Sequence, residues 1–351
     1  MNRIFLVATF CFLFVSAASA QGMGKDRTPE EAEVAVDCNA RGSITDALAT
    51  PAVKLTIEIS GICAEDVEIL RNDVTLRGTD PLTDGIRPAP EGLKRQALTL
   101  FGVNNIIIEN LNLAGANNGI GINASFGVFV INCLIEDNSF AGVIAGTAST
   151  ARVLDTVIRN IGANPNRGIW ATQGSNVSCI RCTIENHQTG IRLTNGSSML
   201  LDDSTVLGTR RGVDARGGSR FDSVLFPSTG PSTIEGVSQF AIRLFDSASA
   251  NLGNDNINGQ IRLFRNSVAT LAGSSQSNPS FFNSIDSGSS LVARDSASLD
   301  GDFFISEFSN VTLPLGSSVS GGLSCSLGAD AFCDNPSTAT ASSNCGQCLN
   351  P

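Results

Sequence analysis

The chain has no tyrosine, one histidine (His187) and one tryptophan (Trp170) among its 351 residues. The absence of tyrosine excludes every mechanism in which a phenol gives or takes a proton. Charged residues make up only 16% of the chain, and the formal net charge is −10. Such an acidic chain opposes non-specific binding to nucleic acid or to an anionic membrane surface, so we expect no nucleic-acid partner.

Long apolar runs are also missing, apart from one at the N-terminus. There Arg3 precedes an apolar segment at residues 4–17, and residues 18–20 read Ala-Ser-Ala. This pattern is typical of a cleaved signal peptide at residues 1–20, and the run is too short to span a bilayer. The sequence therefore predicts a secreted or periplasmic protein that starts near Gln21 and has no transmembrane anchor.

The part of the chain that remains is built on a repeat. Glycine followed by an apolar residue recurs at positions 119, 142, 168, 190 and 212, as GIGI, GVIA, GIWA, GIRL and GVDA. Units of about 22 residues, each too small to bury its own apolar face, are typical of a solenoid. The short apolar segments alternate like strands and show no helical period, which predicts an all-β, single-stranded parallel β-helix. We expect about ten coils between Leu98 and Leu313.

Equal positions in successive coils then predict which side chains stack. Three inward columns follow, and they are Ile120, Val143, Ile169, Ile191, Val213, Ile242 and Ile261; Val130, Val153, Cys179 and Leu201; and Ile135, Ile158, Ile184 and Val206. Asp137, Asn160 and Asn186 recur at one turn, where such residues tolerate a left-handed backbone. His187 follows that turn, so we expect it to face solvent.

Nine cysteines remain after the signal peptide, and an oxidising compartment favours disulfides. Because nine is odd, at least one thiol stays unpaired. We expect Cys38 and Cys63 to pair beside a helix at the front, where Ser43 is a suitable N-cap. The aperiodic end of the chain holds four more cysteines and predicts a disulfide-bonded tail: Cys325, Cys333, Cys345 and Cys348.

Cys179 and Cys182 leave three interpretations open. Cys179 shares an inward column with Val153 and Leu201, so the preferred interpretation is that both cysteines are small buried residues. The second interpretation is a disulfide between them. Metal ligation is the third, because no second pair of ligands accompanies them. We therefore expect no metal site. The chain divides into residues 1–20, a cap and first coils at 21–97, β-helix repeats at 98–322 and the tail at 323–351.

Residues 36–325 resemble the secreted bacterial right-handed parallel β-helix proteins of the pectate-lyase-like superfamily. The resemblance rests on VDCNARGSITDAL, TIEISGICAEDVEILRNDVTLRG, NNIIIENLNLAG and the Gly-Ile coils. It implies a right-handed helix, as parallel crossovers almost always are. The superfamily includes polysaccharide lyases, hydrolases and epimerases as well as members without established activity, so the fold alone predicts no reaction.

The catalytic motifs of that superfamily do not carry over. Asp202 and Asp203 are adjacent acids, but the Gly-His-Gly that accompanies paired acids in polygalacturonase-like enzymes is absent, as is the Asp-Pro-His-Asp of mannuronan epimerases. The sequence therefore favours a surface for a polysaccharide or cell-envelope component; the alternative is a lyase or glycoside hydrolase acting on an acidic glycan, with Ca²⁺ as cofactor if it is a lyase. Cofactor-free binding is the first expectation, and the oligomeric state stays open.

One outward face gathers the candidate ligand-binding residues, because the residue after each inward apolar one points outward. They are Trp170, Arg192, Asp214, Arg216, Arg243, Phe245, Arg262 and Phe264. A flat ring beside guanidinium groups suits a sugar acid, through ring stacking and bidentate carboxylate binding. The alternatives are that Asp214 only neutralises the arginines, and that the exposed rings contact the tail or another copy. Residues 226–236 lengthen one coil and could wall this face.

The weaker candidates are catalytic: Asp202, Asp203, Asp214, Arg192 and His187. Asp203 stacks with Asn132, Asp155 and Arg181 in a polar turn column, so a turn role or an ion pair with Arg181 is the better prediction for it. Adjacent residues on a strand usually face apart, which argues against Asp202 and Asp203 as an acid–base pair.

Overall fold

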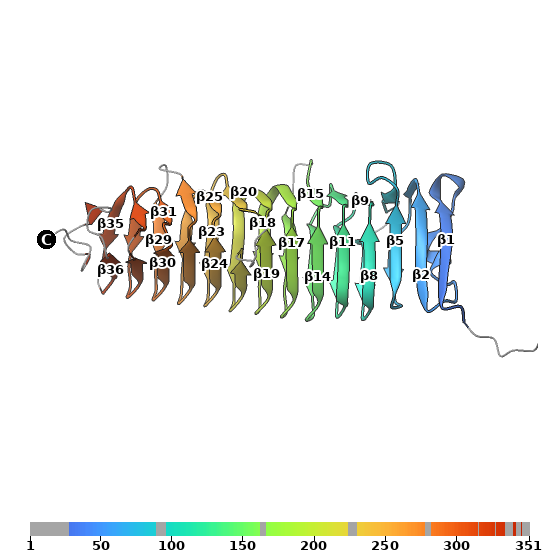
Figure 1. Cartoon of the computed structure of the whole chain (residues 1–351), viewed down its shortest axis with the longest axis horizontal. Helices are drawn as coiled ribbons and strands as arrows, with labels where there is room; N and C mark the ends of the chain where they lie inside the picture. Colours follow the sequence, from blue (N-terminus) through green and yellow to red (C-terminus); the bar gives the residue numbers. More distant parts are fainter. Residues whose placement is uncertain are drawn as a thin grey trace, which may run out of the picture.

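The computed structural model describes residues 28–88, 96–161, 166–223, 230–277, 282–314, 316–326, 328–333, 340–341 and 345. Its strands wind into a rod in which each coil lies directly against the next, from β1 at the blue end to β36 at the red end (Figure 1). The expected signal peptide lies outside the described residues. Within them, no helix has the length and apolar character needed to cross a membrane.

The first wall of the rod, which we call face A, is a parallel sheet of 14 strands. In order, its strands are β1 (Glu31–Asp37), β2 (Lys54–Ser60), β5 (Val74–Gly78), β8 (Asn104–Glu109), β11 (Phe126–Ile131), β14 (Thr150–Leu154), β17 (Asn176–Ile180), β19 (Ser198–Asp202), β21 (Arg220–Asp222), β24 (Ser249–Gly253), β27 (Val268–Ala272), β30 (Ser290–Arg294), β33 (Asn310–Leu313) and β36 (Asp330–Cys333). These strands correspond to about 13 turns rather than ten, because coils before Leu98 and after Leu313 belong to the same solenoid.

The second wall, face B, consists of shorter strands that also pair in parallel. They are β3 (Ile62–Cys63), β6 (Gly85–Ile86), β9 (Asn112–Ala114), β12 (Leu134–Glu136), β15 (Val157–Arg159), the first part of β18 (Thr183–Leu193), the first part of β20 (Thr205–Arg216), β22 (Thr233–Gly236), β25 (Asn256–Asn258), β28 (Ser275–Ser277), β31 (Ser298–Leu299) and β34 (Ser318–Val319).

The third wall, face C, carries the Gly-apolar steps. Its strands are β4 (Val67–Ile69), β7 (Gln96–Phe101), β10 (Asn118–Asn123), β13 (Ala141–Gly146), β16 (Arg167–Ala171), the second parts of β18 and β20, β23 (Phe240–Phe245), β26 (Ile261–Leu263), β29 (Asn283–Ile285), β32 (Phe303–Ile305), β35 (Gly322–Cys325) and β37 (Thr340–Ala341). Because β18 and β20 run without a break from face B into face C, these two walls form one sheet.

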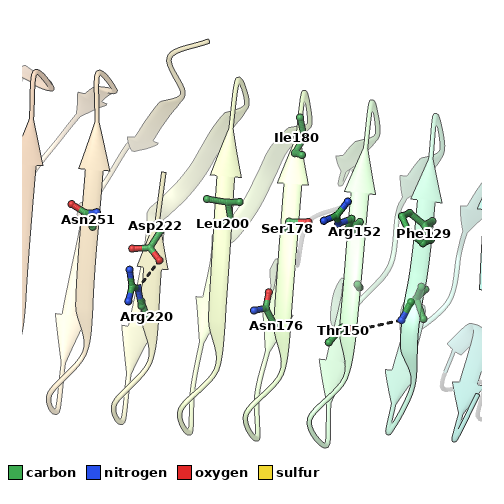
Figure 2. Close-up of a pocket in the computed structure, with 13 residues that line it drawn as sticks. Phe129, Thr150, Arg152, Asn176, Ser178, Ile180, Leu200, Arg220, Asp222 and Asn251 are labelled. Atoms are coloured by element: carbon green, nitrogen blue, oxygen red, sulfur yellow. Dashed lines mark hydrogen bonds and ion pairs between the residues drawn. The ribbon is translucent and has the colours of Figure 1, made fainter. Parts of the chain in front are cut away.

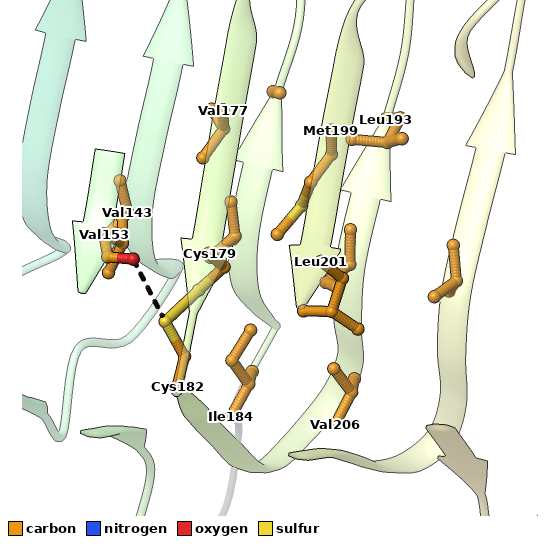
Figure 3. Close-up of a cluster of buried hydrophobic side chains, with 14 of the residues drawn as sticks. Val143, Val153, Val177, Cys179, Cys182, Ile184, Leu193, Met199, Leu201 and Val206 are labelled. Atoms are coloured by element: carbon orange, nitrogen blue, oxygen red, sulfur yellow. Dashed lines mark hydrogen bonds between the residues drawn. A yellow bond between two sulfur atoms is a disulfide. The ribbon is translucent and has the colours of Figure 1, made fainter. Parts of the chain in front are cut away.

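The three predicted inward columns are confirmed. Val143 pairs with Ile169, Val153 pairs with Cys179 and Ile158 pairs with Ile184, each one coil apart. All members of the three columns are buried and belong to one continuous apolar core, part of which is drawn in Figure 3. Each coil therefore buries its apolar side chains only against its neighbours, as the repeat length requires.

The glycine of each Gly-apolar step is explained by close approach. A Cβ at Gly142 would lie 2.3 Å from Cγ2 of Ile158, and one at Gly168 would lie 2.3 Å from Cγ2 of Ile184. The start of face C thus packs directly on the β-branched column of face B. Any larger residue at these positions would push the two walls apart.

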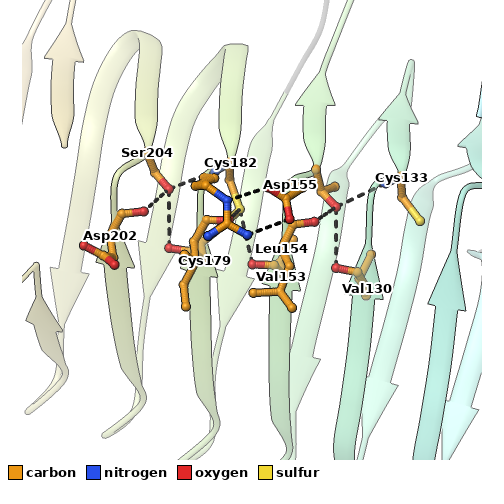
Figure 4. The surroundings of a disulfide bond; sticks show 12 residues. Val130, Cys133, Val153, Leu154, Asp155, Cys179, Cys182, Asp202 and Ser204 are labelled. Atoms are coloured by element: carbon orange, nitrogen blue, oxygen red, sulfur yellow. Dashed lines mark hydrogen bonds and ion pairs between the residues drawn. A yellow bond between two sulfur atoms is a disulfide. The ribbon is translucent and has the colours of Figure 1, made fainter. Parts of the chain in front are cut away.

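The corner between faces A and B is a tight turn with one left-handed residue per coil. Asn132, Asp155, Arg181 and Asp203 have φ angles of 48°, 50°, 52° and 46°, which confirms the predicted polar turn column. The next residue lies inside the corner, where Ser204 Oγ accepts from the backbone N–H of Cys182 at 2.9 Å (Figure 4). Such coil-to-coil bonds satisfy backbone groups that the turn removes from the sheets.

The other predicted turn is only partly as expected. Asp137 and Asn186 have positive φ, at 54° and 61°, but Asn160 does not. Instead Asn160 is buried, and its amide Nδ2 donates to the carbonyl of Asn138 at 3.2 Å. At this corner, the side chain of Asn160 therefore links two successive coils by a hydrogen bond.

The front of the rod is closed by the short helix α1 (Ile44–Ala47), which follows a 3-10 turn, η1 (Cys38–Ala40). Ser43 is the N-cap, as predicted, and its hydroxyl accepts from the backbone N–H of Asp46 at 3.2 Å. Glu65 adds a second cap, since its carboxylate accepts from the backbone N–H of Ile44 at 2.6 Å. Ile44 is fully buried against the first coils, so the helix covers the open apolar end.

Three disulfides are present among the described residues. Cys38 pairs with Cys63, as predicted, and Cys325 pairs with Cys345 in the tail. Cys179 and Cys182 are bonded to each other, so the preferred interpretation of two separate buried residues was wrong and the local disulfide is correct. Cys333 is also disulfide-bonded, while Cys348 lies outside the described residues. Cys133 is buried and, within the described part of the chain, is the free cysteine.

Candidate functional site

The predicted outward column on face C is confirmed by the strand register. Trp170 pairs with Arg192, Arg192 with Asp214, Asp214 with Arg243, and Arg243 with Arg262. Side chains that are up to 92 residues apart in the sequence are thus ladder neighbours on one wall. Arg216 and Phe245 form a parallel column two residues further along each strand.

Asp214 lies at the centre of this face and is wholly buried beneath arginine side chains. Its carboxylate accepts from Nε and Nη2 of Arg216, at 3.1 and 3.0 Å, and from Nε and Nη2 of Arg243, at 2.9 and 2.7 Å. Nη1 of Arg211 lies 3.6 Å from the same group. One acid thus holds three guanidinium groups, and bidentate pairs of this kind fix both distance and orientation.

Aromatic rings alternate with the arginines on both sides of Asp214. The guanidinium of Arg167 lies 4.4 Å from the ring centroid of Trp170 and 4.5 Å from that of Phe140. On the other side, the guanidinium of Arg262 lies 4.3 Å from the ring centroid of Phe264. These stacked contacts hold the guanidinium planes against the protein without neutralising them.

We call this set the arginine face. Its members are Phe140, Arg167, Trp170, Arg192, Arg211, Asp214, Arg216, Phe240, Arg243, Phe245, Arg262 and Phe264. Within this set, six arginines face a single carboxylate.

The excess of positive charge at the arginine face is visible in the pKa values. The pKa of Arg167 is lowered to about 10, mainly by burial and in smaller part by the neighbouring charge of Arg192. Burial also lowers the pKa of Arg192 and that of Arg211, and in both cases Asp214 opposes the change. Each direction means that the charged form is less well solvated here than in water, so an added anion would stabilise it.

Arg167, Arg211, Phe140 and Phe240 belong to this face but were not predicted. For Arg167, Arg211 and Phe240 the sequence held a usable pattern, because the residue three positions before the outward column also stacks: Arg167 pairs with Thr189, Thr189 with Arg211, and Arg211 with Phe240. Phe140 lies outside that column, in which its neighbour Ala141 pairs with Arg167. Of the expected side wall at residues 226–236, residues 226–229 lie outside the described part of the chain, and Thr233–Gly236 form β22 on face B.

His187 is not solvent-facing, and that prediction was wrong. The residue is 1% exposed, and neither ring nitrogen has a hydrogen-bond partner of normal geometry among the described residues. Burial lowers the pKa of the imidazole to about 4. The reason is local: β18 runs straight through the corner with register shifts on both sides of His187, so the side chain points into the rod.

The acidic pair Asp202 and Asp203 stands elsewhere, at the corner that ends β19 on face A. Asp202 is buried, while Asp203 occupies the left-handed turn position. Of the two roles predicted for Asp203, the turn role is therefore confirmed. The ion pair with Arg181 is made by Asp155 instead, whose carboxylate accepts from Nε and Nη2 of Arg181 at 2.6 and 2.7 Å. Of the five catalytic candidates, the structure brings only Arg192 and Asp214 together as ladder neighbours.

Face A carries a groove of about 730 Å³ that the sequence did not indicate. Its axis follows the outward column Phe129, Arg152, Ser178, Leu200, Asp222 and Asn251, one residue from each of six neighbouring strands. Figure 2 shows these side chains along the wall, with the small Ser178 between the large Arg152 and Leu200. In the part of the chain that the structure describes, no group of three or more His, Cys, Asp or Glu could hold a metal ion.

The three-walled coil, the ladder register and the capped end together define a right-handed parallel β-helix. Residues 118–304, just over half of the chain, match the family described as the right handed beta helix region, and the chain belongs to this family. No curated protein matches it.

Solved structures with the same fold are distant. The catalytic domain of a GH87 alpha-1,3-glucanase in complex with nigerose is 15% identical, with a TM-score of 0.44, over 95% of this chain and 70% of that one. An alginate lyase from Paenibacillus sp. str. FPU-7 is 11% identical, with a TM-score of 0.38, over 89% and 98%. A DFA-IIIase from Arthrobacter chlorophenolicus A6 is 12% identical, with a TM-score of 0.41, over 88% and 81%. At this distance the likeness concerns the fold alone.

Proposed function

We propose that this chain is a secreted β-helix that binds an acidic polysaccharide along the arginine face. The observation that carries the proposal is a set of guanidinium nitrogens that are buried without a partner among the described residues: Nη1 of Arg167, Nε of Arg192 and Nε of Arg262. A buried donor without an acceptor costs free energy. The three arginines themselves are partly exposed, so the carboxylate or sulfate groups of an acidic glycan can approach these guanidinium groups from solvent and supply acceptors.

The rings support the same ligand. Trp170 is partly exposed beside Arg192, and its indole Nε1 donates to Thr194 Oγ1 at 3.1 Å, which fixes the ring plane. The ring centroids of Phe245 and Phe264 lie 6.1 Å apart, on the other side of Asp214 from Trp170. A sugar ring can stack on such fixed surfaces while its acidic group reaches the adjacent arginine. The disulfides agree with an oxidising, extracellular or periplasmic location.

Affinity electrophoresis through gels that contain polygalacturonate, alginate or neutral dextran tests the proposal. We expect an acidic polymer to retard the protein and dextran not to. Arg192→Ala and Trp170→Ala should each weaken the retardation roughly tenfold, because each removes a charge-assisted bond or a stacking surface. Arg294→Ala, an arginine of face A, is the matched control. Equal retardation of the wild type, Arg192→Ala and Trp170→Ala would contradict the proposal.

Enzymatic turnover of the polysaccharide is assayed in the same samples. A lyase would produce an unsaturated uronate that absorbs in the ultraviolet, and a hydrolase would produce new reducing ends, with calcium added or left out. We propose binding without turnover, because Asp214 already accepts four hydrogen bonds from Arg216 and Arg243 and is shielded from a substrate. Product formation that is lost in Arg192→Ala would replace the binding proposal by an enzymatic one.

A further inference from the structure

The groove on face A differs in chemistry from the arginine face. It spans five inter-strand spacings, from β11 to β24, and is therefore about 24 Å long. Apolar and polar groups line it in nearly equal measure: Phe129, Ile180 and Leu200 offer apolar surface, and Asn176, Ser178 and Asn251 offer hydroxyl and amide groups. Surfaces of this mixed kind suit a ligand whose faces are apolar and whose edges carry hydroxyls.

Two polar atoms in the groove are left without partners among the described residues. They are Ser178 Oγ and Asp222 Oδ1. Both atoms are buried in the groove, but both side chains are partly exposed, so a small rotation of each side chain presents the atom to a ligand. The other carboxylate oxygen of Asp222, Oδ2, accepts from Nε of Arg220 at 2.5 Å. Asp222 is thus held in place through Oδ2, while Oδ1 is a hydrogen-bond acceptor without a donor.

The free acceptor of Asp222 decides between a neutral and an acidic ligand. The charged residues that line the groove are Arg152, Arg220 and Asp222, and Arg220 is already paired with Asp222 through Oδ2. The other oxygen, Oδ1, needs a donor, which the carboxylate of an acidic sugar cannot supply. A neutral sugar would instead donate hydroxyl hydrogens to Asp222 Oδ1. The exposed Arg152 lies at the other end of the groove, on β14.

We propose that the face-A groove is a second binding site, which takes a neutral oligosaccharide segment lying along the rod. The ring faces pack on Phe129 and Leu200, and the hydroxyls bond to Ser178 and Asp222. Because the groove and the arginine face are on different walls, one molecule can hold a neutral and an acidic glycan at once. The proposal does not depend on the function proposed for the arginine face.

Isothermal titration of the full chain with cellopentaose, laminaripentaose and maltopentaose tests the second site. We expect at least one of these neutral pentasaccharides to bind. Ser178→Phe fills the hollow and should abolish that binding, while Asp222→Asn should weaken it roughly tenfold, since a bond to a charged acceptor becomes one to a neutral amide. Thr75→Phe is the matched control, because Thr75 lies in the same outward column on β5, beyond the groove.

Arg192→Ala separates the two sites. It should leave pentasaccharide binding unchanged, and Ser178→Phe should leave retardation by an acidic polymer unchanged. The inference is overturned if none of the three pentasaccharides binds, or if Ser178→Phe and Asp222→Asn, shown to be folded by circular dichroism, bind like the wild type. Either result would leave the proposal for the arginine face standing, whereas loss of acidic-polymer retardation alone would not affect the groove.

Discussion

Arg243 donates two hydrogen bonds to Asp214 across one coil of the rod, from Nε to Oδ1 at 2.9 Å and from Nη2 to Oδ2 at 2.7 Å. The two residues are 29 positions apart in the sequence, but they are register partners on β20 and β23. Since Arg216 makes a second bidentate pair with the same carboxylate, Asp214 positions guanidinium groups and has no free oxygen to offer a ligand.

Asp214→Asn should therefore lower the free energy of unfolding by about 3 kcal/mol, because it leaves partly buried arginines without their counter-charge. The measurement is the urea midpoint by circular dichroism. Asp246→Asn is the control: its ion pair with Arg265, at 3.2 Å, is largely exposed and should be worth less than about 1 kcal/mol. Equal midpoints for the two variants would show that Asp214 does not stabilise this face.

His187 should make the fold sensitive to acid. Burial lowers the folded-state pKa of this imidazole to about 4, below the ordinary value of 6.5. Between these pH values the unfolded chain binds the proton and the folded chain does not, so the contribution of His187 to the free energy of unfolding falls by about 3 kcal/mol as the pH drops from about 6.5 to about 4. Compared at each pH, the urea midpoint of the wild type should therefore fall relative to that of His187→Phe across this range, since the difference removes the contributions of groups common to both proteins. The same slope in both proteins would assign the acid sensitivity to other groups.

The register of the solenoid could be predicted from the sequence because each coil reuses the same positions. Val143 and Ile169 both follow a glycine, and the spacing of the two glycines alone placed Trp170 beside Ile144. Periodicity identifies stacked columns without any knowledge of the turns between them.

What periodicity could not predict is what happens at the corners and between columns. His187 is buried where β18, like β20 after it, continues from face B into face C without a break, and the spacing of the repeats does not reveal such a change of backbone path. The groove of face A depends on a small residue, Ser178, between the larger Arg152 and Leu200, so it is a property of relative side-chain size. The burial of Asp214 depends on how Arg216 and Arg243 fold over it, which only the side-chain geometry shows.

Asp255 should have the opposite effect of His187 on the pH dependence of stability. This buried acid lies inside the corner beside Ser223 and Ser232. Burial raises its folded-state pKa from 3.8 to about 6, although hydrogen bonds from Ser223 and from the backbone of Ser232 oppose the increase. Between these values the folded chain binds the proton that the unfolded chain has lost. The stabilisation is therefore complete below pH 4 and is lost as the pH rises through about 6, by up to about 3 kcal/mol.

Asp255→Asn keeps the shape of the side chain and removes its titration. Urea midpoints of this variant, compared with the wild type at pH 4, 5, 6 and 7, should lack the decline expected from Asp255. His187→Phe and Asp255→Asn should slope in opposite directions with pH, and the double variant should be about as flat as the wild type, in which the two contributions oppose each other. A decline of unchanged size in Asp255→Asn would show that this acid does not titrate in the corner.

Cys133 should be inert in the folded protein. Its thiol is buried, its Sγ lies 3.3 Å from the carbonyl oxygen of Ile131, and burial raises its pKa to about 12. Only the thiolate reacts with disulfide reagents, so at pH 8 we expect labelling roughly a thousandfold slower than for an ordinary exposed cysteine. The measurement is release of thionitrobenzoate in buffer and in concentrated urea, where the thiol should react at once.

Cys133→Ser is the control. Position 133 belongs to the same inner-corner column as Thr156 and Ser204, whose hydroxyls accept coil-to-coil hydrogen bonds, so a serine suits this position. The variant should release one equivalent less in urea and the same amount in buffer. Fast labelling of the folded wild type that is lost in Cys133→Ser would mean that this corner of the rod opens readily, and the coil-to-coil bonds described above would then be too weak to hold it shut.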